Sequence, residues 1–239
     1  MISIRKNIRQ NLRKYLLTKS DRRLATFPLN SQQRLFYHAY LSNRQFPKEF
    51  HKTCSIFLHT PKCAGRSIIK SFYNNAHIGH YPAIWYEGAY PEEFNSYFKY
   101  SFVRNPYDRI VSAYHYLIQR QFKRNEPITK FVSQFNNFED FVLEWLCEEN
   151  IKKIVVTSPQ YLYLEDQFGS ISHMDYIGHL ESLENDIKFI TKKLNFSSKL
   201  MKTNQSKRKD FRSYYTDEMV DCVTLAYKRD ISLFAYKFE

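Results

Sequence analysis

Short apolar runs alternate along this chain with longer stretches in which apolar residues recur at helical spacing. The apolar runs lie at 54–59, 97–103 and 174–178. A stretch in which apolar residues recur at helical spacing follows each run, and further stretches of this kind occur elsewhere. The helices expected from them are 67–73, 105–120, 138–147, 182–194 and 216–229. Short runs of this kind are typical of strands that are buried on both faces. The alternation of strands and helices predicts an α/β fold with a central, mostly parallel sheet flanked by helices.

The first fifty residues carry a different pattern. Residues 2–19 place apolar side chains on one helical face, and a second helix is expected at 31–42. Residues 1–23 hold eight basic residues and one acid, which is more than half of the formal net charge of +12. We therefore expect a basic helical extension over 1–50 and one domain over 51–239. The extension either lies on an anionic membrane or on nucleic acid, or it packs against the domain.

Composition limits the classes of function further. Aromatic residues make up 17% of the 239 residues, which is too much burial potential for a disordered chain. The five glycines form neither G-x-G-x-x-G nor G-x-x-x-x-G-K-[ST], so both common glycine-rich phosphate loops are absent. The four cysteines show no C-x-x-C spacing, and no stretch reads as a signal peptide or a membrane span. We expect a reduced, cytoplasmic protein without a metal, peripheral to the inner face of the membrane at most.

The first junction between a predicted strand and a predicted helix has the sequence H-T-P-K-C-A-G-R-S and ends at Ser67. Small residues in such a turn let backbone N–H groups face a ligand at the start of the helix. The positive end of the helix and the Lys62 ammonium both favour phosphate or sulfate. Ser67 adds a hydroxyl and Arg66 a second cation. The alternative is an ordinary surface loop with exposed basic side chains.

The second junction has the sequence F-V-R-N-P-Y-D-R-I-V-S-A-Y. Asn105 is expected to cap the helix, with proline at its first position. Arg104 then stands at the carboxyl end of a strand, where open α/β sheets bind ligands, and can meet a phosphate there. Ser112, two turns into the helix, can join Arg104 on the same anion. In the alternative, Asp108 and Arg109 form a surface pair and Ser112 has no role.

These two segments, about forty residues apart, together resemble the carbohydrate sulfotransferases of the heparan-sulfate 2-O and related bacterial type, known as family 2. The likeness continues more loosely through Ser158-Pro159-Gln160, through 175–183 and through 230–236, and so covers about 53–239. Enzymes of this family use 3′-phosphoadenosine 5′-phosphosulfate as the sulfate donor and need no metal. The resemblance implies a three-layer fold like that of the P-loop nucleoside triphosphatases. It also implies in-line transfer of a sulfuryl group to a hydroxyl of a carbohydrate or glycoconjugate.

The resemblance also assigns roles to single residues. Lys62 would contact the 5′-phosphosulfate and stabilise the charge that develops on the leaving phosphate. The other residues that would hold the donor are Cys63, Ala64, Gly65, Arg66 and Ser67 at the 5′-phosphate, Arg104 and Ser112 at the 3′-phosphate, and Arg208 and Lys209 in a late basic loop. The family often has threonine where this chain has Cys63 and Arg66. At a helix N-terminus the Cys63 thiol is expected to gain thiolate character.

Sulfuryl transfer also needs a base that accepts the proton of the acceptor hydroxyl, and histidine suits this at neutral pH. The related heparan-sulfate enzymes have a His-Gly-His between the two motifs, and His77-Ile78-Gly79-His80 occupies that interval here. Matching Gly-His makes His80 the preferred catalytic base and His77 the weaker candidate, with Glu87 and His59 in reserve. The alternatives are two structural histidines or a metal site, for which a third ligand is missing.

The sequence therefore predicts a sulfotransferase whose acceptor pocket is built from the loops 76–96 and 120–137. A different class remains open, a nucleic-acid-binding protein that uses the basic N-terminal arm and the abundant aromatic residues. Removal of residues 1–23 separates the two, because a nucleic-acid binder would lose most of its affinity whereas sulfate transfer would survive. A phosphoryl-transfer enzyme of the P-loop type is disfavoured, because the G-K-[ST] motif and ligands for Mg²⁺ are missing.

Overall fold

The computed structural model of this protein describes residues 45–121, 131–166, 168–196, 200–201 and 209–239. The expected helices at 2–19 and 31–42, most of the proposed 1–50 extension and Arg208 lie outside these residues.

A parallel sheet of three strands stands at one end of the described structure. The strands are β1 (Ser55–Leu58), β2 (Phe98–Val103) and β3 (Tyr176–His179), in the order β1-β2-β3. Leu58 pairs with Ser101, and Val103 pairs with His179. Because all three strands are parallel, their carboxyl ends meet at one edge of the sheet.

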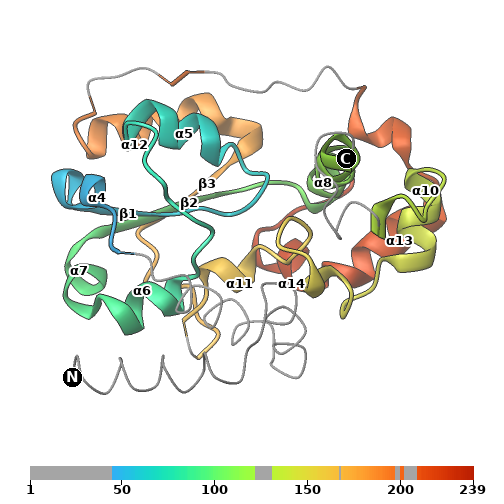
Figure 1. The fold of residues 1–239 in the computed structure, drawn as a ribbon, viewed down its shortest axis with the longest axis horizontal. Helices are drawn as coiled ribbons and strands as arrows, with labels where there is room; N and C mark the ends of the chain where they lie inside the picture. The colour runs from blue at the N-terminus through green and yellow to red at the C-terminus, as the bar shows by residue number, and fades with distance from the viewer. Residues whose placement is uncertain (1–44, 122–130, 167, 197–199, 202–208) are drawn as a thin grey trace.

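Helices cover both faces of this sheet (Figure 1). On one face lie α5 (Gly65–Phe72) and α12 (Leu183–Lys193), and on the other lie α6 (Ala83–Ala89) and α7 (Pro91–Ser96). The short helix α4 (Lys48–Thr53) precedes β1, and η3 (Leu180–Ser182) links β3 to α12. A first apolar cluster, with Ile56, Phe57 and Phe102 at its centre, fills the space between sheet and helices. The α/β fold with a parallel sheet flanked by helices is thus confirmed.

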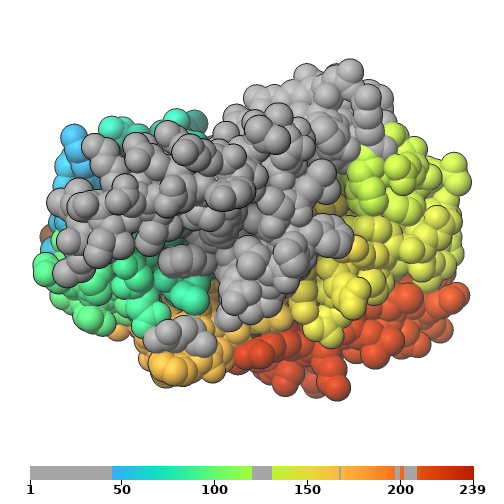
Figure 2. All heavy atoms as spheres, turned by 60° about the horizontal axis from the view of Figure 1, so that its bottom comes forward, coloured from blue at the N-terminus to red at the C-terminus, as the bar shows by residue number. Residues whose placement is uncertain are grey.

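The chain between β2 and β3 and the C-terminal residues form a second, helical part of the molecule. Its elements are α8 (Pro106–Gln121), α10 (Phe138–Asp140), the π-helical turn η1 (Phe141–Trp145), η2 (Ile151–Lys153), α11 (Tyr161–Leu164), η4 (Phe211–Tyr214), α13 (Asp217–Ala226) and α14 (Lys228–Leu233). Residues of α8, η1 and α13 bury a second apolar cluster that includes Leu117, Phe141 and Val223. In Figure 2 the yellow segment that contains η1 lies against the red C-terminal helices.

Two helices differ from the sequence prediction. The helix expected at 138–147 has only one short α-helical stretch, widens into the π-helical turn and ends at Leu146. The helix expected at 216–229 stops at Ala226, and α14 begins after Tyr227. The interruption directs two side chains inward: the Tyr227 hydroxyl donates to the carbonyl of Thr157, and Asp230 becomes fully buried. Within the described ranges, no helix is long and apolar enough to cross a membrane.

Candidate active site

A cleft of about 1500 Å³ opens beyond the carboxyl ends of β1 and β2. Both predicted junctions line it, together with loop residues near 77 and near 209. Of the site residues expected from the sequence, the cleft brings together Lys62, Cys63, Ala64, Gly65, Arg66, Ser67, His77, His80, Arg104, Ser112 and Lys209. The lining also includes Tyr116 and Asp108, which the sequence did not suggest as site residues.

The loop after β1 is shaped without glycine at its left-handed positions. Lys62 and Ala64 have φ angles of 69° and 57°, and Ala64 caps α5 without any side-chain hydrogen bond. The N–H groups of Ser67 and Ile68 donate to the carbonyl of Ala64 at 2.9 and 3.3 Å. The N–H groups of Gly65 and Arg66 come before the first of these bonds and have neither a partner within the helix nor a side-chain cap. A Cβ atom added to Gly65 would lie 2.0 Å from Cδ2 of His59. Gly65 is required because the imidazole ring packs directly on its backbone.

Lys62 is half-buried in the cleft, and its environment disfavours its charge. Its ammonium nitrogen lies 4.3 Å from the centre of the Tyr116 ring, a cation–π contact. Burial is the main cause that lowers the pKa of Lys62 from 10.5 to about 8, and the nearby Arg104 cation lowers it further. An anion bound beside Lys62 would offset both effects.

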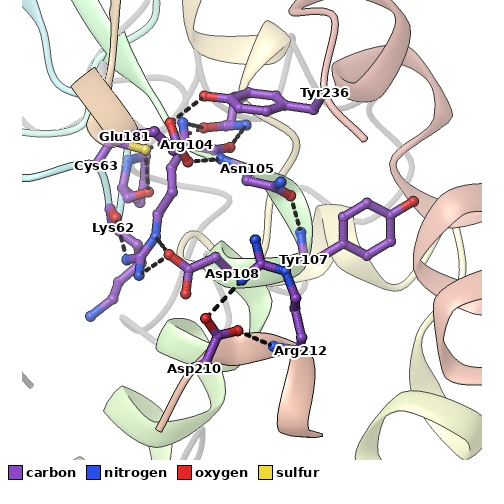
Figure 3. A network of polar contacts seen from close by, with 12 residues as sticks. Lys62, Cys63, Arg104, Asn105, Tyr107, Asp108, Glu181, Asp210, Arg212 and Tyr236 are labelled. Carbon is purple, nitrogen blue, oxygen red and sulfur yellow. Dashed lines mark hydrogen bonds and ion pairs between the residues drawn. The ribbon is translucent and has the colours of Figure 1, made fainter. Parts of the chain in front are cut away.

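The guanidinium of Arg104 is held by three contacts with Asp108 and Lys62 (Figure 3). Its Nε and Nη2 atoms lie 2.8 and 2.6 Å from Oδ2 of Asp108, and its Nη1 donates to the carbonyl of Lys62 at 3.1 Å. A guanidinium carries five N–H groups. Among the described residues, these contacts use three of the five, so one N–H on Nη1 and one on Nη2 remain for an anion.

The alternative pairing of Asp108 with Arg109 on the surface is wrong. Arg109 is only 1% exposed, and its guanidinium donates to the carbonyls of Val156, Thr157 and Ser158. Arg109 is buried because it lies on the inner face of α8, where the second apolar cluster packs. Asp108 is one turn after Arg104, and this spacing brings the two side chains together.

The predicted helix cap after β2 is confirmed, and Glu181 supports it. Oδ1 of Asn105 accepts the N–H of Tyr107 at 3.1 Å. Glu181 accepts the N–H of Asn105 at 2.7 Å on one oxygen and the hydroxyl of Tyr236 at 3.0 Å on the other (Figure 3). The carboxylate of Glu181 thus faces the cleft with both oxygens hydrogen-bonded, which reduces its repulsion of an anion.

His80 has one tautomer favoured by its surroundings. Its Nδ1 atom lies 2.8 Å from the carbonyl oxygen of His59, and a carbonyl only accepts hydrogen bonds, so Nδ1 carries the proton. Burial lowers the pKa of His80, and the Lys62 cation lowers it as well, so the neutral ring is favoured. In that form Nε2 is a proton acceptor. His77 is exposed at the rim of the cleft, and Glu87, on α6, is not part of the lining.

The structure does not support thiolate character at Cys63. The thiol is 1% exposed and donates a hydrogen bond to Oε1 of Gln160 at 3.2 Å. Burial raises the pKa of Cys63 to about 12, although Arg109 and Arg104 act in the opposite direction. The helix end therefore does not produce a thiolate here, and Cys63 serves as a hydrogen-bond donor. Among the residues with described positions, no group of three or more His, Cys, Asp or Glu side chains is arranged to hold a metal ion.

Comparison with known proteins gives the family of this chain. The family model described as "Sulfotransferase family" matches residues 51–237, which is most of the chain and includes both junctions. Searches of curated proteins and of solved structures gave no significant match. The match over so much of the chain shows that this protein belongs to the sulfotransferase family.

Proposed function

We propose that this protein transfers a sulfuryl group from 3′-phosphoadenosine 5′-phosphosulfate to a hydroxyl of a carbohydrate or glycoconjugate. The observation that carries the proposal is the convergence of two anion-binding elements on one cleft. One element is the start of α5, which has no side-chain cap, together with Lys62. The other is the pair of Arg104 guanidinium N–H groups that no described residue accepts. Two such elements suit a donor that carries phosphate at both its 5′ and its 3′ position.

In this assignment, the backbone N–H groups of residues 63–67 and the Ser67 hydroxyl hold the 5′-phosphate. Arg104 and Ser112 hold the 3′-phosphate, and Lys209 lies at the rim on the same cleft. Four acidic residues line the described cleft, namely Asp108, Glu181, Glu184 and Asp210. Three of them oppose this binding only weakly, because Asp108 is paired with Arg104, Asp210 is paired with Arg212, and Glu181 is hydrogen-bonded on both oxygens.

The transfer itself is an in-line displacement at sulfur. The acceptor oxygen forms a bond to sulfur while the bond between sulfur and the 5′-phosphate oxygen breaks. The Lys62 ammonium stabilises the negative charge that collects on this leaving oxygen. Nε2 of His80 accepts the proton of the acceptor hydroxyl, since Nδ1 already carries a proton, which it donates to the carbonyl of His59.

Calorimetry with adenosine 3′,5′-bisphosphate, the product of the donor, tests the proposal directly. The folded protein should bind it, and labelled sulfate should pass from the donor to members of a glycan panel. Lys62→Ala and Arg104→Ala should each abolish turnover while the circular dichroism spectrum stays unchanged. Folded wild-type protein that binds no bisphosphate would refute the proposed donor, and labelling of non-carbohydrate hydroxyls alone would refute the proposed acceptor.

The two candidate bases are separated by single substitutions. Removal of a general base typically lowers the rate by about 10²- to 10⁴-fold. His80→Ala should lower kcat in this range without weakening bisphosphate binding, whereas His77→Ala should have a smaller effect because that ring is exposed at the rim. Near-normal turnover of His80→Ala, or a larger loss in His77→Ala, would show that His80 is not the base.

A further inference from the structure

A buried amide connects the two anion-binding elements. Nε2 of Gln160 donates to the carbonyl of Arg104 at 2.9 Å, and its Oε1 accepts the N–H of the same residue at 2.8 Å. Oε1 also accepts the Cys63 thiol at 3.2 Å. The N–H of Arg104 can only donate and its carbonyl can only accept, so these contacts fix the orientation of the amide. Gln160 itself is fully buried and is not part of the cleft lining.

The backbone that carries Gln160 is itself held from two sides. Asp230 on α14 is fully buried and accepts the N–H groups of Gln160 and Tyr161 at 2.8 and 2.9 Å. Arg109 on α8 donates to the carbonyls of the residues just before, with the shortest contact, 2.7 Å, to Ser158. A carboxylate and a guanidinium, both buried, therefore fix the segment 156–161 and with it the place of the amide.

We propose that Gln160 is a positioning residue that fixes the distance between the 5′-phosphate loop and Arg104, and so allows one ligand to engage both. This inference rests on the proposed function. The residue pairing of β1 and β2 ends where Leu58 pairs with Ser101. On the cleft side the Arg104 guanidinium then reaches the carbonyl of Lys62. On the buried side, the amide of Gln160 bonds both to Cys63 in the loop after β1 and to the backbone of Arg104 just after β2.

Loss of this amide leaves the N–H and the carbonyl of Arg104 buried without their partners. Such groups are costly to leave unsatisfied, so the backbone at Arg104 would shift to recover hydrogen bonds. A shift at this point moves the guanidinium relative to the loop. A ligand with one phosphate would be little affected, whereas a ligand with two phosphates would no longer fit both elements at once.

The experiment compares two nucleotides by calorimetry on the full chain. Adenosine 5′-monophosphate reports on the loop alone, and adenosine 3′,5′-bisphosphate reports on both elements. In Gln160→Met, the ratio of the two Kd values, monophosphate over bisphosphate, should fall by at least about fivefold relative to the wild type. The Kd of the monophosphate should change by less than about twofold. Gln160→Glu keeps the acceptor oxygen but not the donor to the Arg104 carbonyl. It should lower the ratio in the same direction and serves where the methionine variant does not fold.

Ser55→Ala is the matched control, because it removes a fully buried hydroxyl that hydrogen-bonds with Thr53 and Tyr73 at the start of β1, the end of the strand away from the cleft. It should lower the melting temperature but leave the ratio of Kd values unchanged. An unchanged ratio in both Gln160 variants, or an equal fall in Ser55→Ala, would overturn the inference. Wild-type protein that binds neither nucleotide would instead refute the proposed function, and the inference with it.

Discussion

The lowered pKa of Lys62 predicts that donor binding weakens as the pH rises through 8. With a pKa of about 8 in the free protein, the charged fraction of Lys62 falls from about nine-tenths at pH 7 to about one-tenth at pH 9. If only the charged form holds the 5′-phosphate well, the Kd for adenosine 3′,5′-bisphosphate rises about tenfold over this interval. A lysine with its ordinary pKa of 10.5 would stay charged, and the Kd would change by only a few per cent.

Calorimetry at pH 7, 8 and 9 and constant ionic strength measures this change. Bound phosphate favours the ammonium form, so the complex should also take up a proton between pH 8 and 9. The heat of binding then depends on the ionisation enthalpy of the buffer. Lys62→Arg is the control, because a guanidinium stays charged across the whole interval. Its Kd should be flat with pH even if its affinity differs from that of the wild type.

Two results would refute this reasoning. The first is a wild-type Kd that stays constant within about twofold from pH 7 to pH 9, where the titration calls for about tenfold. The second is an equal dependence on pH in Lys62→Arg, which would assign the titration to another group. The charged and titratable groups that act on Lys62 are Arg104, Arg66 and the Cys63 thiol. Burial raises the pKa of the Cys63 thiol to about 12, well above this interval.

Further predictions follow from the packing and from the charge of the chain. Gly65→Ala places a methyl group 2.0 Å from the His59 ring and should destabilise the fold by about 1–3 kcal/mol in urea titrations, and weaken bisphosphate binding. Gly88→Ala, at an exposed helical position, should be neutral or stabilising, and an equal loss there would contradict the steric argument. Arg109→Met leaves buried carbonyls and Asp230 without their cation and should cost about 3 kcal/mol in the same titration, whereas a cost under about 1 kcal/mol would show that the buried network does not stabilise the fold. Deletion of residues 1–23 should leave sulfate transfer intact, and loss of turnover together with loss of nucleic-acid binding would favour the alternative function.

Local sequence patterns were sufficient to locate the three strands and both junctions. The apolar runs at 54–59 and 97–103 contain β1 and β2, in which every residue but Phe98 is buried. Asn105 caps α8 as its position before proline predicted. The convergence of Lys62 and Arg104 on one cleft also follows from the pattern, since neighbouring parallel strands end at the same edge.

Contacts between residues distant in sequence could not be predicted in this way. Gln160 bonds to Arg104 across 56 residues and to Asp230 across 70, and neither contact leaves a periodic signal. The break at Tyr227 and the low reactivity of Cys63 have the same origin. At Tyr227, burial against a distant segment outweighs the tendency of the helix to continue. At Cys63, burial outweighs the tendency of a helix end to favour a thiolate.

The division of the apolar side chains into two clusters affects how the protein opens. The cleft is lined from both sides, by Ile78 of the cluster around the sheet and by Tyr116, which packs against the cluster around α8. Amide hydrogen exchange should then show two protected units with different opening free energies. A nucleotide that contacts both sides stabilises the weaker unit most, because that unit can no longer open without releasing the ligand. Donor binding should therefore convert two exchange units into one, so that the sulfate donor acts as part of the folded structure while it is bound.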